Sequence, residues 1–182
     1  MKSILVVSVL VMCLVIAGCK STEPQRPEEK AVMQAQIQDT VSLLKEKDPS
    51  IDRFFTQSYG YVIFPQVFKA AFVGGGASGR GEVYEQGRLV GYSRLSQASI
   101  GFSFGGEYFR EAIFFRDKAD LDKFKSEEYT FAAQVTGVAL SEGVAAKADY
   151  KDGMAVFVMA DKGLMADASL GGQKFTFVPL TK

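Results

Sequence analysis

The feature that most constrains the fold is a change in sequence pattern at Tyr59. From there on, aromatic and β-branched segments with frequent glycine alternate with turn signals. Consecutive strands joined by tight turns favour an antiparallel sheet, and glycine inside strands favours sharp bending. The sequence therefore predicts an α+β fold whose mainly antiparallel sheet is strongly curved or barrel-like. The expected strands are 61–64, ending at Pro65, then 70–76, 81–85, 89–95, 98–106, 111–115, 131–140, 144–150, 154–160, 164–170 and 174–180, with turns at 86–88, 152–153 and 171–172.

An amphipathic helix is expected ahead of this sheet, over about 29–47. Met33, Ile37, Val41 and Leu44 recur at helical spacing, with polar residues between them. The polar face mixes acidic and basic side chains, whereas helices that lie on membranes usually carry a lysine- or arginine-rich face. Packing against the sheet is therefore the preferred role, and a position on the membrane surface is the alternative.

A short helix is expected directly after this one. Asp48 followed by Pro49 has the form of an N-cap and a first helical residue. The helix would bury Ile51, Phe54 and Phe55 in the core.

Another short helix is expected from Lys118 to about residue 127. Asp117 and Asp120 resemble a capping box at its start. Together with Asp122 they could suggest a calcium loop, but the glycine that such a loop needs is absent. Helix capping is the simpler interpretation of these carboxylates.

The first residues have the order of a secretory signal. Lys2 is followed by an apolar run over 4–16 and by the small pair Ala17-Gly18. Cys19 comes next, and 16–19 resembles the bacterial lipobox, in which the cysteine receives a diacylglycerol and becomes the acylated N-terminus. We expect a cleaved lipoprotein signal over 1–18, an acylated flexible tether over 19–29 and a single domain over 30–182. The alternative is an ordinary signal peptide with an unrelated cysteine.

Composition narrows the chemistry of the expected mature chain. Of 182 residues, none is histidine and two are cysteine, at positions 13 and 19. Loss of Cys13 with the signal and acylation of Cys19 would leave no thiol for a disulfide or a metal. Lys plus Arg equals Asp plus Glu at 21 each, and a near-neutral chain has no overall charge that attracts nucleic acid. No metal or other cofactor and no nucleic-acid partner are therefore expected.

Two glycine-rich motifs resemble catalytic or phosphate-binding signatures. The G-x-S-x-G pattern around Ser103 would need a histidine to activate the serine, and the chain has none. The stretch 74–81 lacks the Gly-Lys-Ser/Thr of a phosphate loop. Ser103 is interpreted as a strand residue and 74–81 as a glycine-rich strand and turn, and a non-enzymatic protein is expected. A hydrolase using a Ser-Lys pair or paired carboxylates is a less favoured alternative.

The order of motifs resembles the SYLF domain family over roughly residues 40–180. The motifs are V-I-F-P at 62–65, the glycines of 74–81, Gly101, Gly105 and Gly106, A-D-L-D-K-F at 119–124, K-G-L at 162–164 and S-L-G-G at 169–172. This resemblance implies a lipid-binding module. Eukaryotic members bind phosphoinositides, yeast members bind actin, and bacterial members are commonly lipoproteins. The family supplies no catalytic residues to carry over.

The sequence thus predicts a lipoprotein attached to membrane lipid through acylated Cys19, with a lipid-binding domain in the cell envelope. Lys20 after the cysteine indicates the periplasmic face of the outer membrane. Lys69, Arg80, Arg88 and Arg94 are the basic residues nearest the glycine-rich stretch, and they are the candidate contacts for an anionic phospholipid headgroup. The alternative is a structural or stress-related envelope protein that acts through a protein partner.

Overall fold

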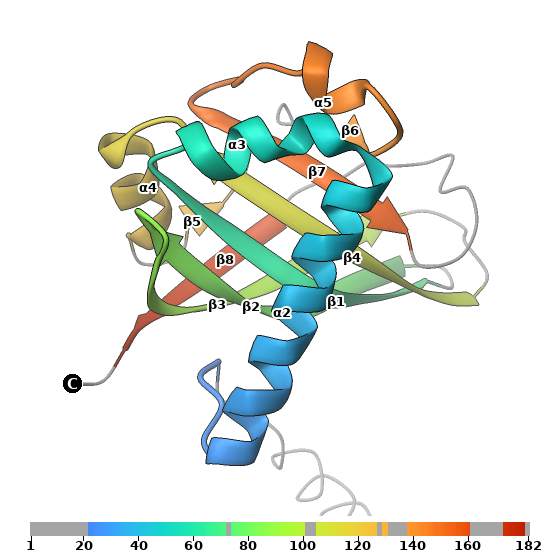
Figure 1. The fold of residues 1–182 in the computed structure, drawn as a ribbon. Helices are drawn as coiled ribbons and strands as arrows, with labels where there is room; N and C mark the ends of the chain where they lie inside the picture. Colours follow the sequence, from blue (N-terminus) through green and yellow to red (C-terminus); the bar gives the residue numbers. More distant parts are fainter. Residues whose placement is uncertain are drawn as a thin grey trace, which may run out of the picture.

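The computed structural model describes residues 22–71, 74–100, 105–126, 129–130, 138–160 and 173–180. Its centre is one eight-stranded sheet in the order β5-β8-β3-β2-β1-β4-β7-β6 (Figure 1). All neighbouring pairs are antiparallel except β6 and β7. The α+β prediction is confirmed. The strands are β1 (Gly60–Ala71), β2 (Gly74–Glu85), β3 (Arg88–Ile100), β4 (Gly105–Phe115), β5 (Tyr129–Thr130), β6 (Val138–Ala139), β7 (Met154–Ala160) and β8 (Gln173–Pro179).

The sheet is strongly curved but is not closed. Three strands separate β8 from β4 in the sheet order. Even so, the Gln173 amide nitrogen on β8 lies 3.0 Å from a carboxylate oxygen of Glu111 on β4. Likewise the rings of Phe64 on β1 and Phe175 on β8 have centroids 5.7 Å apart. Within the described part of the chain, β5 and β6 end the sheet without pairing to each other.

The inner, concave face of the sheet encloses the first hydrophobic cluster. Helix α4 (Lys118–Lys125) contributes Leu121 and Phe124 to it. Burial of these apolar side chains is the main stabilising term for such a sheet. The sheet supplies the other members, which are Val62, Phe64, Val67, Ala77, Val83, Leu95, Phe109, Ile113, Phe115, Met154, Val156, Val158 and Phe175.

The outer, convex face is covered over one half by helices, and this contact forms the second cluster. The helices are α2 (Pro27–Lys47), the 3₁₀ turn η1 (Pro49–Ile51), α3 (Asp52–Gln57) and α5 (Val144–Lys147). Figure 1 shows α2 running obliquely across the sheet rather than along it. The described members of the second cluster are Met33, Ile37, Leu44, Ile51, Phe54, Ile63, Tyr92, Ala112, Phe114, Leu140, Ala145, Ala155 and Phe157.

Helix α2 matches the sequence prediction closely. Met33, Ile37 and Leu44 are buried against the sheet, so packing on the sheet is confirmed as its role. The helix begins at Pro27, two residues earlier than expected. Proline suits the first helical turn because the missing N–H would have no partner there. The last residues of the expected tether are therefore helical.

The capping predictions are also confirmed. Asp48 accepts a hydrogen bond from the backbone N–H of Ser50 at 3.0 Å, and Asp117 accepts one from Asp120 at 3.0 Å. Each side chain satisfies a donor that a helix start leaves without an intrahelical partner. Helix α4 ends at Lys125, slightly before the expected residue 127.

The strand predicted over 144–150 is wrong, because tertiary contacts hold a helical turn there. The Asp48 carboxylate accepts the backbone N–H of Ala145 at 2.7 Å. The Arg53 guanidinium donates to the carbonyl oxygens of Ala145 and Ala148. These side chains serve both ends of α5, and they come from residues about a hundred positions earlier in the chain.

Proline 65 does not end a strand as predicted. Strand β1 continues through it, with shifts of register between Ile63 and Gln66 against β2 and between Phe64 and Val67 against β4. Such a bulge accommodates a residue that has no N–H to donate. The expected strand 70–76 is likewise divided, because 70–71 belong to β1 and 74–76 to β2.

The glycine-rich stretch 74–81 lies in β2, which confirms a strand in place of a phosphate loop, but the turn expected within it is wrong because β2 is continuous. The turn at Gln86-Gly87 has the expected positive φ angles of 49° and 75°, and the turn at Asp152-Gly153 has 52° and 82°. The predictions for Ser103, Gly101, the 164–170 strand and the 171–172 turn lie outside the described residues.

Candidate functional site

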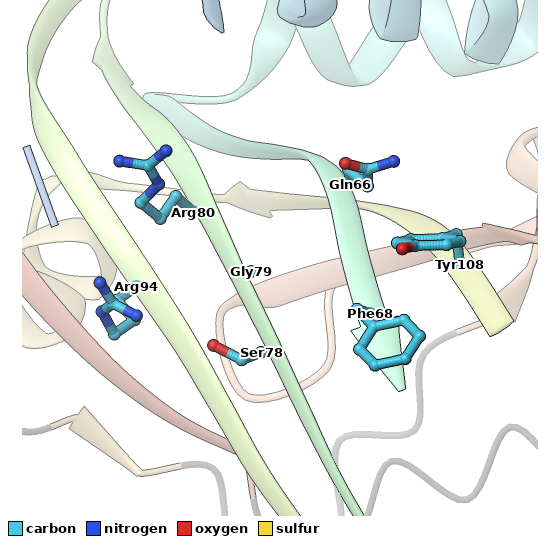
Figure 2. A pocket seen from close by; sticks show the side chains of 7 residues that line it. All are labelled: Gln66, Phe68, Ser78, Gly79, Arg80, Arg94 and Tyr108. Carbon is cyan, nitrogen blue, oxygen red and sulfur yellow. The ribbon is translucent and has the colours of Figure 1, made fainter. Parts of the chain in front are cut away.

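The other half of the convex face is not covered by α2. It holds an open hollow of about 220 Å³, lined by residues of four neighbouring strands. Figure 2 shows two arginines at one side and two aromatic rings at the other, with the small residues of β2 between them. The lining residues are Gln66, Phe68, Ser78, Gly79, Arg80, Arg94 and Tyr108.

The bulge in β1 determines which residues reach this hollow. Before the bulge, Ile63 points outward into the second cluster and Phe64 points inward into the first. After it, Val67 points inward, so Gln66 and Phe68 point outward. Successive strand residues alternate between the two faces of the sheet. One extra residue at the bulge therefore changes whether the even- or the odd-numbered residues of β1 point outward.

The aromatic pair is the most exposed apolar feature of the hollow. Phe68 is 44% exposed and Tyr108 is 45% exposed. They are register partners on β1 and β4, and their ring centroids lie 5.0 Å apart. A β-carbon at Gly106 would lie 2.8 Å from the Phe68 ring, so glycine there leaves room for the ring. Exposed aromatic side chains beside polar groups are typical of surfaces that meet a membrane interface or a partner.

The arginine pair carries the electrostatic character of the hollow. Arg80 on β2 and Arg94 on β3 are direct register partners. Like charges placed opposite each other on one sheet face destabilise the pairing. Guanidinium groups present planar sets of donors that match phosphate and carboxylate oxygens. The pair is therefore suited to an anion that both arginines contact.

The structure brings together two of the four predicted headgroup residues. Lys69 follows Phe68 on β1 and belongs to the opposite, inward-facing set, level with Ala77. Arg88 starts β3 next to the turn, roughly 20 Å along the strand from Arg94 at about 3.3 Å per residue. Cys19 lies outside the described residues.

Sequence reasoning did not find Phe68 and Tyr108. The signal was present, since Phe68 lies six positions before the glycine-rich stretch and Tyr108 two positions after Gly106. Treating Pro65 as a strand end removed the alternation from which the outward position of Phe68 could be inferred. Tyr108 was placed between two expected strands and not in one.

Besides the helix-capping Asp48, two buried carboxyl groups of the described residues lie outside the hollow. Glu82 lies beneath α2, where desolvation raises its pKa, partly offset by the hydrogen bond from Tyr84. Glu111 lies in the concave core, where desolvation raises its pKa to about 7, partly offset by the bond from Gln173. Since neither lines the hollow, we assign them to the core.

No group of three or more potential metal ligands occurs among the residues that the structure describes. Within the same ranges, every helix is too short or too polar to cross a bilayer.

The structure thus defines a class: an α+β domain with a curved, open antiparallel sheet and a basic, aromatic hollow on its convex face. The chain is similar to Beta cell expansion factor A of Aeromonas veronii, with 27% identity over 154 residues. The match covers 84% of this chain and 59% of that relative, so the chain corresponds to only part of it. No family model matches the chain.

Proposed function

We propose that this protein is a non-enzymatic lipoprotein of the bacterial cell envelope, whose SYLF-like domain binds anionic phospholipid headgroups. Acylated Cys19 would hold it at the periplasmic face of the outer membrane. Arg80 and Arg94 would contact the headgroup, and Phe68 and Tyr108 would enter the interfacial region of the bilayer.

The observation that carries this proposal is the register pairing of Arg80 with Arg94 beside two exposed aromatic rings. Like charges placed directly opposite each other destabilise strand pairing, and an anion contacted by both arginines would offset that repulsion. Basic residues near an anionic bilayer contribute about 1 kcal/mol each. Aromatic side chains such as Tyr108 are enriched at the level of lipid headgroups. The combination fits a lipid surface better than a small soluble anion, which would not need the rings.

The position of the expected anchor is compatible with this orientation. Cys19 precedes Thr22, the first described residue, by three positions. Three residues span at most about 11 Å when extended. An acylated cysteine would therefore keep the start of α2, and the sheet beneath it, close to the membrane surface.

The test uses residues 19–182 with Cys19→Ser, so that any binding comes from the domain and not from acyl chains. The described members of the two clusters, with the side chains packed against them, lie between residues 33 and 177, so removal of 1–18 takes none of them away. We expect this protein to float with vesicles of phosphatidylethanolamine and phosphatidylglycerol in equal parts. Binding should weaken as salt rises, because salt screens exposed charges.

Arg80→Gln should reduce the bound fraction about fivefold, on the scale of about 1 kcal/mol for each basic residue at an anionic surface. Arg88→Gln is the matched control, with the same change of charge at the far end of β3, and it should reduce binding by less than about twofold. No flotation at low salt would contradict the lipid-binding proposal. Equal losses from both variants would contradict the assignment to the hollow.

Anchoring is tested separately by mass spectrometry of the protein purified from membranes. We expect a mature chain that begins at Cys19 and carries acyl groups. An unmodified chain beginning elsewhere would contradict the anchor while leaving headgroup binding open to the flotation test. Crosslinking from Phe68 in intact cells distinguishes a lipid from the alternative, a protein partner in the envelope.

A further inference from the structure

Arg110 on β4 continues the cross-strand row of the arginine pair. The register between β1 and β4 shifts at the bulge, which leaves residues 65–66 together opposite Arg110. On the other side of β1, Gln66 is the register partner of Arg80, and Arg80 is the partner of Arg94. Four neighbouring strands therefore place Arg110, Gln66, Arg80 and Arg94 side by side in that order.

Arg110 points to the convex face, as the residues of the hollow do. Its chain neighbours Phe109 and Glu111 are both buried in the concave core, and successive strand residues alternate between faces. The Arg110 guanidinium lies 3.9 Å from the carboxylate of Asp39 on α2. Tyr108, two positions earlier on the same face, lines the hollow. Arg110 therefore lies at the border between the hollow and α2.

The contact between Arg110 and Asp39 is weak enough for another anion to replace it. Its length of 3.9 Å exceeds that of a hydrogen bond, and the Asp39 side chain is 63% exposed. Exposed ion pairs of this kind contribute little to stability. A phosphate oxygen accepts short, strong hydrogen bonds from a guanidinium. A phosphate beside Arg110 is therefore a better partner for it than the Asp39 carboxylate is.

The spacing of the row separates two positions for an anion. Neighbouring strands lie about 4.8 Å apart, so the long side chains of Arg80 and Arg94 can contact the same phosphate. Arg110 lies two strands from Arg80, which is about 10 Å, and Gln66 stands between them. Side chains on a convex face diverge, and this keeps Arg110 apart from the arginine pair. One phosphate fits at the pair and a second fits at Arg110.

We propose that Arg110 is a third headgroup contact and that the preferred ligand is a lipid with two phosphate groups. This inference rests on the proposed headgroup binding and names its ligand class. One phosphate lies between Arg80 and Arg94. The second replaces Asp39 at Arg110, and Gln66 lies beside the group that links the two phosphates. Two lipids share this chemistry: cardiolipin carries both phosphates on one glycerol, and lipid A carries them on a disaccharide.

The test measures binding of residues 19–182 carrying Cys19→Ser to three kinds of phosphatidylethanolamine vesicle. Phosphatidylglycerol, cardiolipin or lipid A supplies the same amount of anionic phosphate in each. Binding to one of the two-phosphate lipids should be about fivefold tighter than to phosphatidylglycerol, the contribution of one basic residue at an anionic surface. The vesicle that shows this preference identifies the source of the phosphates.

Arg110→Gln should reduce the preference to less than about twofold and leave binding to phosphatidylglycerol nearly unchanged. Arg88→Gln is the matched control, because it removes the same charge from the far end of β3, and it should retain the preference. Equal binding to all three vesicles, or a preference that persists in Arg110→Gln, would overturn the inference alone. Absence of binding to every vesicle would overturn the proposed function as well.

Asp39→Asn is a second variant that leaves Arg110 in place. Removing the competing carboxylate should tighten binding to the preferred lipid about twofold, the range of an exposed ion pair. The gain should be absent in an Arg110→Gln background, because the two residues act through one contact. Circular dichroism verifies the fold of each variant. If Arg110→Gln does not fold, Asp39→Asn decides, and no gain in binding would then overturn the inference.

Discussion

The two halves of the convex face are made by the same strands, but their outward-pointing side chains differ in how deeply they are buried. In the covered half, β1 contributes Ile63 and β4 contributes Phe114, and both are fully buried. In the uncovered half, the same strands contribute Phe68 and Tyr108, which are nearly half exposed. Figure 1 shows the reason, since α2 crosses the sheet obliquely and covers only part of it.

This difference is the basis for proposing that the uncovered half serves binding. Soluble proteins usually expose large apolar side chains singly, and a contiguous pair marks a site of interaction. The charged residues of β2 follow the same division. Glu82 is buried under α2, whereas Arg80, two positions earlier on the same face, reaches the hollow.

The largest expected effect on stability comes from truncating one phenylalanine side chain in each half and comparing the two variants. Phe114→Ala should lower the free energy of unfolding by about 3–5 kcal/mol, the usual cost of deleting a buried phenylalanine. Its ring packs against those of Phe54, Phe55 and Phe157 at centroid distances of 4.8–5.9 Å. Phe68→Ala should cost less than about 1 kcal/mol. Urea unfolding followed by circular dichroism measures both. A large cost for Phe68→Ala would show that the uncovered half is a part of the core.

How much of the fold the sequence can predict depends on how far apart in the chain the interacting residues lie. Helix α2 and the caps at Asp48 and Asp117 were predictable, because apolar spacing and capping act within a few residues. The α5 turn was not, since Asp48 and Arg53 hold it from a distant part of the chain. The composition of 144–150, with three alanines and one β-branched residue, Val144, gives a strand no support.

The hollow was only half predictable for a related reason. The basic residues near the glycine-rich stretch were identified, but composition could not separate Arg80 and Arg94 from Lys69 and Arg88. Only the strand register places the first two opposite each other, and only the bulge at Pro65 turns Phe68 outward. Both depend on pairing between strands, which a single strand's sequence does not specify.

A second prediction extends the comparison to the concave face, where a charged group is fully enclosed. Glu111 has its pKa raised to about 7 by desolvation, and one of its carboxyl oxygens accepts from Gln173. An unfolded glutamate titrates near 4.5. Between these values the unfolded chain loses its proton while the folded chain keeps it. The contribution of Glu111 to stability should therefore be greatest below about pH 4.5, fall as the pH rises to about 7, and then level off.

Glu111→Gln should remove this fall. At about pH 8 the variant should be more stable than the unsubstituted protein by about 3–4 kcal/mol, since each pKa unit corresponds to about 1.4 kcal/mol. At about pH 4 the difference should vanish or reverse, because both side chains are then neutral. Chemical unfolding at the two pH values provides the measurement. A pH dependence that persists in Glu111→Gln would assign it to another group, such as Glu82.

The smallest of these stability effects tests the bulge in β1, which determines which residues of that strand point outward in the uncovered half. Gly81 lies opposite the bulge, and a β-carbon there would lie 2.4 Å from the backbone oxygen of Ile63. Gly81→Ala should therefore destabilise the fold by about 1–3 kcal/mol, as overpacking against an immobile backbone does. In Gly106→Ala, the corresponding clash of 2.8 Å is with the Phe68 ring, which is exposed and free to rotate. That variant should cost less than about 0.5 kcal/mol, and urea unfolding distinguishes the two. Equal costs would mean that the uncovered half is as rigid as the covered one, and that its rings are not available to a membrane.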